Sequence, residues 1–268
     1  DDKAHSIKAV CVVHNETSTG VTSDIAAVRR AMDAAGHPAL LLVDTISALG
    51  SVEFKHDEWG VDVSIASSQK GLMMPPGLGF NAVSEKALAA SQRANMPRAF
   101  WAWDDILEAN KNGFWPSTPN TNLLYGLGEA IDMFNEEGLP QVFARHKRHA
   151  QAARSAAAAW GLELVCQAPA LYSPVLTAVR MPLREDGSSF DADHLREVAL
   201  RACNMSLGMG LGQLSGKVFR IGHLGDFNDL SLVGALGGVE MALRAAAVPH
   251  RPGGTQAALD SLRHSLAS

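Results

Sequence analysis

Cysteine is scarce in this sequence, and neither sign of charge dominates it. The three cysteines among 268 residues, Cys11, Cys166 and Cys203, are far apart and odd in number. They predict neither a disulfide framework nor a metal site, and they favour a reducing, cytoplasmic environment. The formal net charge is only −5, and no basic stripe indicates a nucleic-acid partner. No run of 18 apolar residues indicates a membrane span.

Hydrophobic residues, by contrast, are plentiful. They make up 47% of the chain, which is enough for a sizeable core in one or two domains. Ten histidines are scattered through the sequence. His146 and His149 lie three residues apart, but Arg145, Lys147 and Arg148 surround them. This charged setting predicts a solvated helix face rather than a zinc site.

The first part of the chain alternates between strand and helix patterns. Residues 7–13 are β-rich, residues 25–35 have an apolar helical face, and residues 39–44 are an apolar run. A second apolar run, 61–66, leads to Lys70. This order predicts an α/β fold with a mostly parallel sheet covered by helices, in which ligands bind at the carboxyl ends of the strands.

Two charged side chains, Asp44 and Lys70, follow neighbouring strands at that edge. Each has a simple explanation, because Asp44 can cap a turn and Lys70 can extend into solvent. A desolvated lysine, however, has a lowered pKa and attacks carbonyls. A lysine that forms an imine and an aspartate that keeps a pyridine nitrogen protonated are the two groups that pyridoxal phosphate requires. The pair therefore indicates this cofactor more strongly than either residue alone.

Three other polar features have two interpretations each. Loop 14–20 (HNETSTG) follows the first strand, where it either binds a ligand or forms an ordinary turn. Residues 115–120 (WPSTPN) precede a helix, and they either hold a phosphate or cap that helix. Arg220 stands among apolar residues in a predicted strand, so it binds either a substrate carboxylate or an internal Asp or Glu.

The remaining sequence predicts further strands and helices. Residues 96–115 are irregular and aromatic, which is typical of a core or a subunit interface. Residues 208–212 contain glycines whose spacing differs from that of a dinucleotide-binding motif, and they are predicted to form a mobile loop. The other expected elements are strands at 77–83, 162–165, 175–181, 204–207 and 217–222, and helices at 84–92, 120–137, 139–160, 191–203 and 226–247.

These elements predict two domains. A large domain spans residues 1–137, and a smaller α+β domain spans residues 138–247. The alanine-rich helix at 139–160 is expected to connect them. Residues 248–268 contain prolines and glycines and are predicted to be a tail with a weak helix at its end.

Four motifs occur in order within residues 7–245. They are LLVD at 41–44, SSQK at 67–70, WPSTP at 115–119 and KVFRIGHLG at 217–225. With these motifs the chain resembles the class V pyridoxal-phosphate aminotransferases, and it is most similar to those that act on glyoxylate with serine, alanine or aspartate. The resemblance implies a fold-type I architecture and transfer of an amino group from one of these amino acids to glyoxylate, giving glycine.

The resemblance also implies a role for each residue that would contact the cofactor, pyridoxal 5'-phosphate. Lys70 would bind it covalently and then move the proton at the substrate Cα. Asp44 would pair with the pyridine nitrogen. Gln69 would contact the cofactor near its phenolic oxygen or its phosphate, and Thr17 would lie beside the ring.

Two further residues are implied in substrate binding and assembly. Arg220 would bind the substrate α-carboxylate. Thr118 would reach the phosphate of the cofactor in a partner subunit, so the resemblance implies a homodimer with shared active sites. Trp115 stands where some relatives carry a tyrosine for the same phosphate.

One departure from the family and two alternatives follow. Family members are longer at the N-terminus, so we expect the N-terminal part of the large domain, with a phosphate-binding turn, to be absent from this numbering. A cysteine desulfurase or related lyase is one alternative, but Cys166 and Cys203 have buried settings and Gln69 stands where those enzymes carry a histidine. A truncated, non-catalytic domain is the other.

Overall fold

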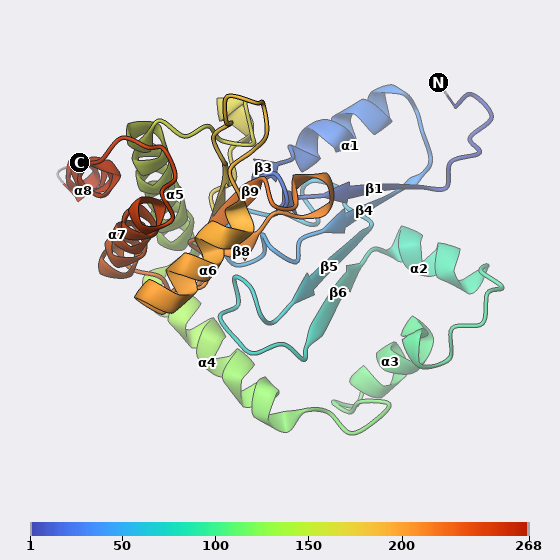
Figure 1. Cartoon of the computed structure of the whole chain (residues 1–268). Coiled ribbons are helices and arrows are strands. Elements are labelled where there is room, and N and C mark those ends of the chain that lie inside the picture. The colour runs from blue at the N-terminus through green and yellow to red at the C-terminus, as the bar shows by residue number, and fades with distance from the viewer. Residues whose placement is uncertain (1, 267–268) are drawn as a thin grey trace.

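A four-stranded sheet forms the centre of the first half of the chain. The computed structural model describes residues 2–266. The strands lie in the order β1 (Ala9–Val13), β4 (Leu40–Asp44), β5 (Val63–Ser67) and β6 (Gly79–Val83). The first three are parallel, and β6 is antiparallel to β5. The mostly parallel sheet predicted from the sequence is therefore confirmed (Figure 1).

Helix α1 (Ile25–Ala34) covers one face of this sheet (Figure 1). The Asp24 side chain caps it by accepting a hydrogen bond from the Ala27 amide at 2.8 Å. Ile25 and Met32 pack into a buried cluster with Leu41 and Val43 of β4. This packing anchors β4, so the end of that strand has a fixed position. A short hairpin of β2 (Asn15–Glu16) and β3 (Val21–Thr22) follows β1.

The aromatic segment, which we define as residues 96–131, is more helical than predicted. The sequence predicts irregular structure up to residue 115, but the chain forms a 3₁₀ turn, Ala99–Trp101, and then α3 (Trp103–Asn110). Helices α2 (Glu85–Gln92) and α4 (Thr121–Glu137) lie on either side of these elements in the sequence. Several large apolar side chains of the segment are exposed, among them Met96, Phe100, Trp101, Phe114, Trp115 and Tyr125.

The second half of the chain has its own three-stranded antiparallel sheet and its own core. The sheet order is β7-β9-β8. The small-domain core is the buried cluster that joins this sheet to its four helices, and it includes Trp160 and Phe219. The elements are α5 (Leu139–Trp160), β7 (Leu176–Arg180), α6 (Ala192–Cys203), β8 (Gly208–Met209), β9 (Val218–Gly222), α7 (Asp229–Ala245) and α8 (Gly254–Leu266), with 3₁₀ turns at Pro169–Leu171 and Gly212–Leu214.

Several predicted elements of this half are wrong in detail. The strand expected at 204–207 does not form, because Asn204 adopts a left-handed conformation (φ 49°) that ends α6. The glycine loop at 208–212 instead begins with β8. Residues 162–165 make only an isolated bridge between Leu164 and Val179. The weak terminal helix is α8, whose Ala258 is fully buried in the small-domain core. The domain boundaries at 137 and 247 stay predictions.

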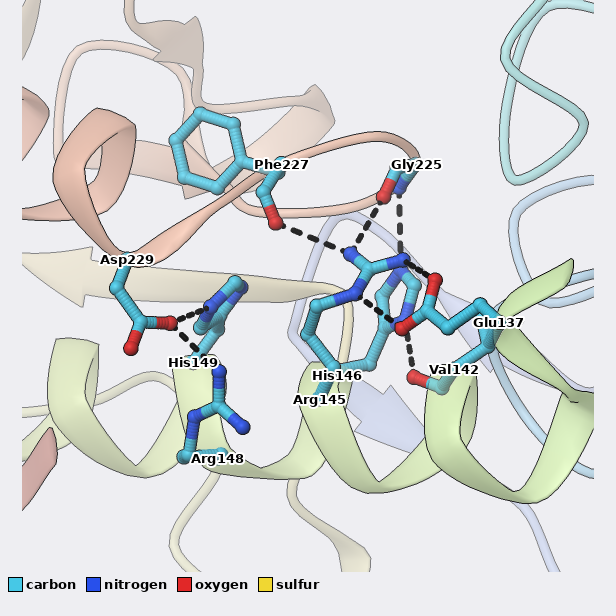
Figure 2. A network of polar contacts seen from close by, with 9 residues as sticks. All are labelled: Glu137, Val142, Arg145, His146, Arg148, His149, Gly225, Phe227 and Asp229. Carbon is cyan, nitrogen blue, oxygen red and sulfur yellow. Dashed lines mark hydrogen bonds and ion pairs between the residues drawn. The ribbon is translucent and has the colours of Figure 1, made fainter. Parts of the chain in front are cut away.

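The solvated face predicted around the α5 histidines is also wrong. His146 and His149 are 1% and 0% exposed. The prediction failed because two of the three neighbouring cations have partners inside the fold: Arg145 pairs with Glu137 and Arg148 with Asp229, each at 2.7 Å (Figure 2). A cationic neighbour therefore does not require that the histidines face solvent. Among residues 2–266, no helix combines the length and the apolar character needed to cross a membrane.

Candidate active site

Lys70 lies in a turn three residues beyond the end of β5. The Met73 amide donates to the Lys70 carbonyl at 2.9 Å, which closes the turn. Ser68 fixes the preceding residues, since its hydroxyl donates to the Pro75 carbonyl at 2.7 Å and it is fully buried. The side chains of Gln69 and Lys70 are exposed, in line with the simpler of the two explanations of this lysine. The Lys70 amine has no ion pair or hydrogen bond with any residue that the structure describes, so it is available to a ligand.

Asp44 is the last residue of β4 and is half-buried. One carboxylate oxygen accepts a hydrogen bond from the Ile46 amide at 2.8 Å. The loops after Asp44 and after Lys70 touch, because a Cβ at Gly71 would overlap the carbonyl oxygen of Leu49. Only glycine allows this approach of the two backbones. The two predicted cofactor residues therefore lie on two loops that pack directly against each other.

Thr17 lies in the turn of the β2–β3 hairpin. Buried Asn15 ties this hairpin to the loop after Asp44, since its side-chain amide donates to the Ser47 hydroxyl at 2.9 Å. That hydroxyl donates in turn to the Asn15 carbonyl at 2.7 Å, and Thr22 donates to the Asn15 side chain at 3.1 Å. Asn15 and Ser47 were not singled out in the sequence, because such residues fill ordinary turns as well.

Arg220 on β9 binds backbone carbonyls rather than a carboxylate. Its Nε donates to the Met209 carbonyl at 2.7 Å, and one terminal nitrogen donates to the Thr17 carbonyl at 2.8 Å. The alternative that Arg220 pairs with an internal Asp or Glu is therefore wrong within residues 2–266. Burial lowers the pKa of Arg220, and nearby Arg196 lowers it further. The guanidinium remains charged, and a second terminal nitrogen is left for an anion.

Gly208 explains how β8 comes close enough to hold Arg220. A Cβ at this position would lie 3.0 Å from the Cβ of Arg220 and 3.2 Å from its Nε. A larger residue would push the guanidinium away from the Met209 carbonyl. Gly208 belongs to the glycine run at 208–212, so this run marks a close approach to Arg220, although its spacing alone predicted only a loop.

A cavity of about 300 Å³ brings three of the predicted site residues together: Thr17, Lys70 and Arg220. Its other lining residues are Ser47, Val175, Leu176, Ser206, Gly208, Gly222 and Leu224. Asp44 and Gln69 do not line this cavity, but each lies within a few residues of one that does.

Thr118, unlike Asp44 and Gln69, is also far in the sequence from every residue that lines this cavity. It is exposed in the loop between α3 and α4. Figure 1 shows this loop on the far side of β5 and β6 from β8 and β9. Asn120, two residues after Thr118, caps α4 by accepting a hydrogen bond from the Leu123 amide at 3.2 Å, so the capping interpretation of residues 115–120 holds for Asn120.

Comparison with known proteins identifies the family. The sequence profile described as aminotransferase class-V matches residues 3–181. The chain belongs to this family. It is 50% identical over 265 residues to a serine–glyoxylate aminotransferase of Methylorubrum extorquens, which covers 97% of the chain and 65% of that relative. It is 45% identical to an L-aspartate–glyoxylate aminotransferase of Paracoccus denitrificans, over 100% of the chain and 66% of the relative.

Solved structures of aminotransferases agree with this assignment. Pyridoxamine–pyruvate aminotransferase from Mesorhizobium loti superposes with a TM-score of 0.88 and 31% identity, over 97% of this chain and 66% of that one. Ureidoglycine–glyoxylate aminotransferase from Bacillus subtilis gives a TM-score of 0.83 and 28% identity, over 96% and 65%. The fold-type I architecture implied by the resemblance is confirmed. The chain spans about 65% of the length of the curated relatives it matches.

Proposed function

We propose that this chain supplies the cofactor-binding and substrate-binding residues of an aminotransferase that moves an amino group from a small amino acid to glyoxylate, giving glycine. One observation carries the proposal. Lys70 and Arg220, which are 150 residues apart in the sequence, line the same cavity. An amino acid with its α-carboxylate at Arg220 would have its amino group and Cα beside Lys70.

The residues of the site fit pyridoxal 5'-phosphate. Lys70 presents an amine without a partner among the described residues, and Asp44 has one carboxylate oxygen free of the Ile46 amide. Thr17 and Ser47 add hydroxyls to the cavity wall. When bound, this cofactor supplies an electron sink that acidifies the Cα–H bond of an amino acid.

We assign each residue the task that its position permits. Lys70 holds the cofactor and afterwards moves the proton at the substrate Cα, because its amine lies on a short turn beside the cavity. Asp44 holds a proton on the pyridine nitrogen. Thr17 lies beside the ring, and Gln69 contacts the cofactor near its phenolic oxygen or its phosphate.

Arg220 would orient the substrate. The two carbonyls of Met209 and Thr17 fix the plane of its guanidinium. A planar fork held in this way binds a carboxylate with little further loss of side-chain freedom. Arg220 therefore recognises the α-carboxylate that serine, alanine and aspartate share, and it does not choose among these donors.

A homodimer with shared active sites is the proposed assembly. Thr118 is exposed and lies away from the cavity of its own chain, as expected if it reaches the phosphate in a partner subunit. The aromatic segment that surrounds it exposes large apolar side chains, Trp101 and Phe114 among them. Exposed apolar groups of this size are typical of a protein interface.

The alternatives receive less support. A desulfurase requires a reactive thiol at the cavity, but Cys11, Cys166 and Cys203 do not line it, and Cys166 is buried. A non-catalytic domain would have no need for an unpaired lysine beside a held arginine. The proposed location is the cytoplasm, where three free thiols would persist.

An acceptor panel tests the function. The intact protein, loaded with pyridoxal 5'-phosphate, is given serine as donor and glyoxylate, pyruvate or 2-oxoglutarate as acceptor. We expect the largest kcat/KM with glyoxylate, with glycine as product. Equal rates with the three acceptors would contradict the proposed substrate class, and no transfer to any of them would contradict the aminotransferase itself. Replacing serine by alanine or aspartate in the same assay identifies the donor.

A further inference from the structure

Gly225 lies directly against the turn that carries Lys70. It is buried, with a φ of 82° that favours glycine. A Cβ at this position would lie 3.3 Å from Cγ of Met73 and 3.8 Å from the carbonyl oxygen of Lys70. The position of the Gly225 backbone therefore determines how the loop after β9 meets the Lys70 turn.

The same loop begins at the strand that carries Arg220. Gly222 and Leu224 line the cavity together with Lys70 and Arg220. Residues 222–225 thus connect the two groups that a substrate amino acid must reach at once. A shift of this loop would change the separation of the Lys70 amine from the Arg220 guanidinium.

Two residues of helix α5 bind the backbone N–H and the backbone carbonyl of Gly225 (Figure 2). The Gly225 amide donates to Nε2 of His146 at 3.1 Å. A terminal nitrogen of Arg145 donates to the Gly225 carbonyl at 2.8 Å and to the Phe227 carbonyl at 3.0 Å. Glu137 fixes Arg145 through two hydrogen bonds of 2.7 Å.

His146 can accept this hydrogen bond only in one neutral form. Its Nδ1 lies 2.8 Å from the Val142 carbonyl, which can only accept, so Nδ1 carries the proton. Nε2 then has a free lone pair for the Gly225 amide. Burial lowers the pKa of His146 to about 4, so the ring is neutral near pH 7.

We propose that His146 is a positioning residue of the active site, which holds residues 222–225 so that Lys70 and Arg220 face one substrate at the correct separation. This inference rests on the proposed function. His146 is not among the residues that line the cavity, so it acts through the Gly225 amide. Without it, that buried amide would lose its acceptor.

His149 offers a matched control on the same helix. It is as buried as His146, and its Nε2 lies 2.7 Å from the Asp229 carboxylate, to which Arg148 also binds. Figure 2 shows this second cluster beside the first, with no bond to Gly225. Loss of His149 should weaken the fold without releasing the Gly225 amide.

The test compares His146→Leu, His146→Gln and His149→Leu in the intact protein. Hydrogen–deuterium exchange of residues 223–227 is measured without cofactor. The rate of the first half-reaction with serine and the melting temperature are measured with pyridoxal 5'-phosphate bound. His146→Leu should speed amide exchange and lower the half-reaction rate by roughly 10- to 100-fold, because small misplacements of reacting groups have effects of this size. His146→Gln keeps an acceptor and should restore most of both.

His149→Leu should lower the melting temperature while the half-reaction keeps a rate near that of the wild type. Equal rates for His146→Leu and His149→Leu, or no recovery in His146→Gln, would overturn the positioning role. If the wild-type protein transfers no amino group, the proposed function fails instead. The exchange of the Gly225 amide then still tests the hydrogen bond by itself.

Discussion

The small-domain core and the aromatic segment are both rich in apolar side chains, but only the first covers them within this chain. In the small-domain core, Trp160 and Phe219 are 1% and 0% exposed. In the aromatic segment, Trp101 and Tyr125 are 81% and 83% exposed. The difference teaches that composition predicts how much apolar surface a chain has, but not whether the chain itself buries it.

Strand β9 also has buried side chains on one face and an open side on the other. Phe219 and Ile221 point into the small-domain core, while Arg220 between them reaches the cavity. Side chains on a strand alternate between its two faces, so a covered side and an open side follow from one sequence. The buried side anchors the strand in the core, and the open side leaves Arg220 facing the cavity.

The largest expected effect compares two phenylalanines. Phe219→Ala should lower the free energy of unfolding by about 3–5 kcal/mol, because it leaves a cavity in the small-domain core. Phe100→Ala, at an exposed position of the aromatic segment, should change it by less than about 0.5 kcal/mol. Urea unfolding of both variants measures the difference. Similar losses would show that the aromatic segment is covered within one chain.

The open side of β9 is tested at Arg220. Arg220→Gln should lower kcat/KM for the amino donor by roughly 100-fold, because the carboxylate loses its charged hydrogen bonds. Stability should change little, since the side chain lies outside the core. Arg180→Gln, at an exposed position on neighbouring β7, serves as the control in the same steady-state assay. An unchanged kcat/KM in Arg220→Gln would remove the arginine from substrate binding.

Because several histidines are buried in their neutral form, the folded protein should lose stability as the pH falls. Burial lowers the pKa of His14 and His146 to about 4 and that of His223 to about 3. The unfolded chain, with histidine pKa values near 6.5, therefore binds more protons between these limits. The free energy of unfolding should fall as the pH falls from 6.5 toward 4, by up to about 1.4 kcal/mol per pH unit for each histidine.

Urea unfolding at several pH values between 7.5 and 5.5 measures this loss. His223→Gln should flatten the dependence, because one buried group no longer titrates. A stability that stays constant over this range, in the wild-type protein, would show that the rings are not desolvated as the fold implies.

Replacement of Trp101 should have the smallest effect on folding stability, but it should weaken the association of two subunits. Trp101→Ala should leave the free energy of unfolding within about 0.5 kcal/mol in each subunit. It should nevertheless weaken self-association by about 10-fold or more if this ring lies in an interface. Sedimentation equilibrium of the intact protein measures the dimer dissociation constant. An unchanged constant would move the interface away from the aromatic segment.

The sequence predicted the central sheet, because strand ends are local signals. The resemblance to the family, and not the local pattern, implied that Lys70 and Arg220 serve the same site, and both line one cavity. The prediction failed for the α5 histidines, where charged neighbours outweighed the periodicity. Val142, His146, His149 and Ala153 share one helix face, and this spacing was the available signal of burial. Arg145 and Arg148 pair with Glu137 of α4 and Asp229 of α7, and no local sequence pattern reveals these partners.

Other site features depend on tertiary contacts alone. Asn15 and Ser47 matter because two loops 32 residues apart meet. Gly208 matters because β8 lies beside Arg220, and Gly225 because its backbone touches the Lys70 turn. Each is an ordinary turn residue when only its neighbours in the sequence are considered.

The most direct test of the account is the visible absorbance of the intact protein with pyridoxal 5'-phosphate. After removal of free cofactor, the wild-type protein should keep an absorbing complex that serine bleaches, and borohydride should fix the cofactor on Lys70 as judged by peptide mass. Lys70→Ala should keep no such complex, whereas the control Lys86→Ala should match the wild type. A colourless wild-type protein, or an unchanged complex in Lys70→Ala, would contradict the assignment of Lys70 as the residue that holds the cofactor.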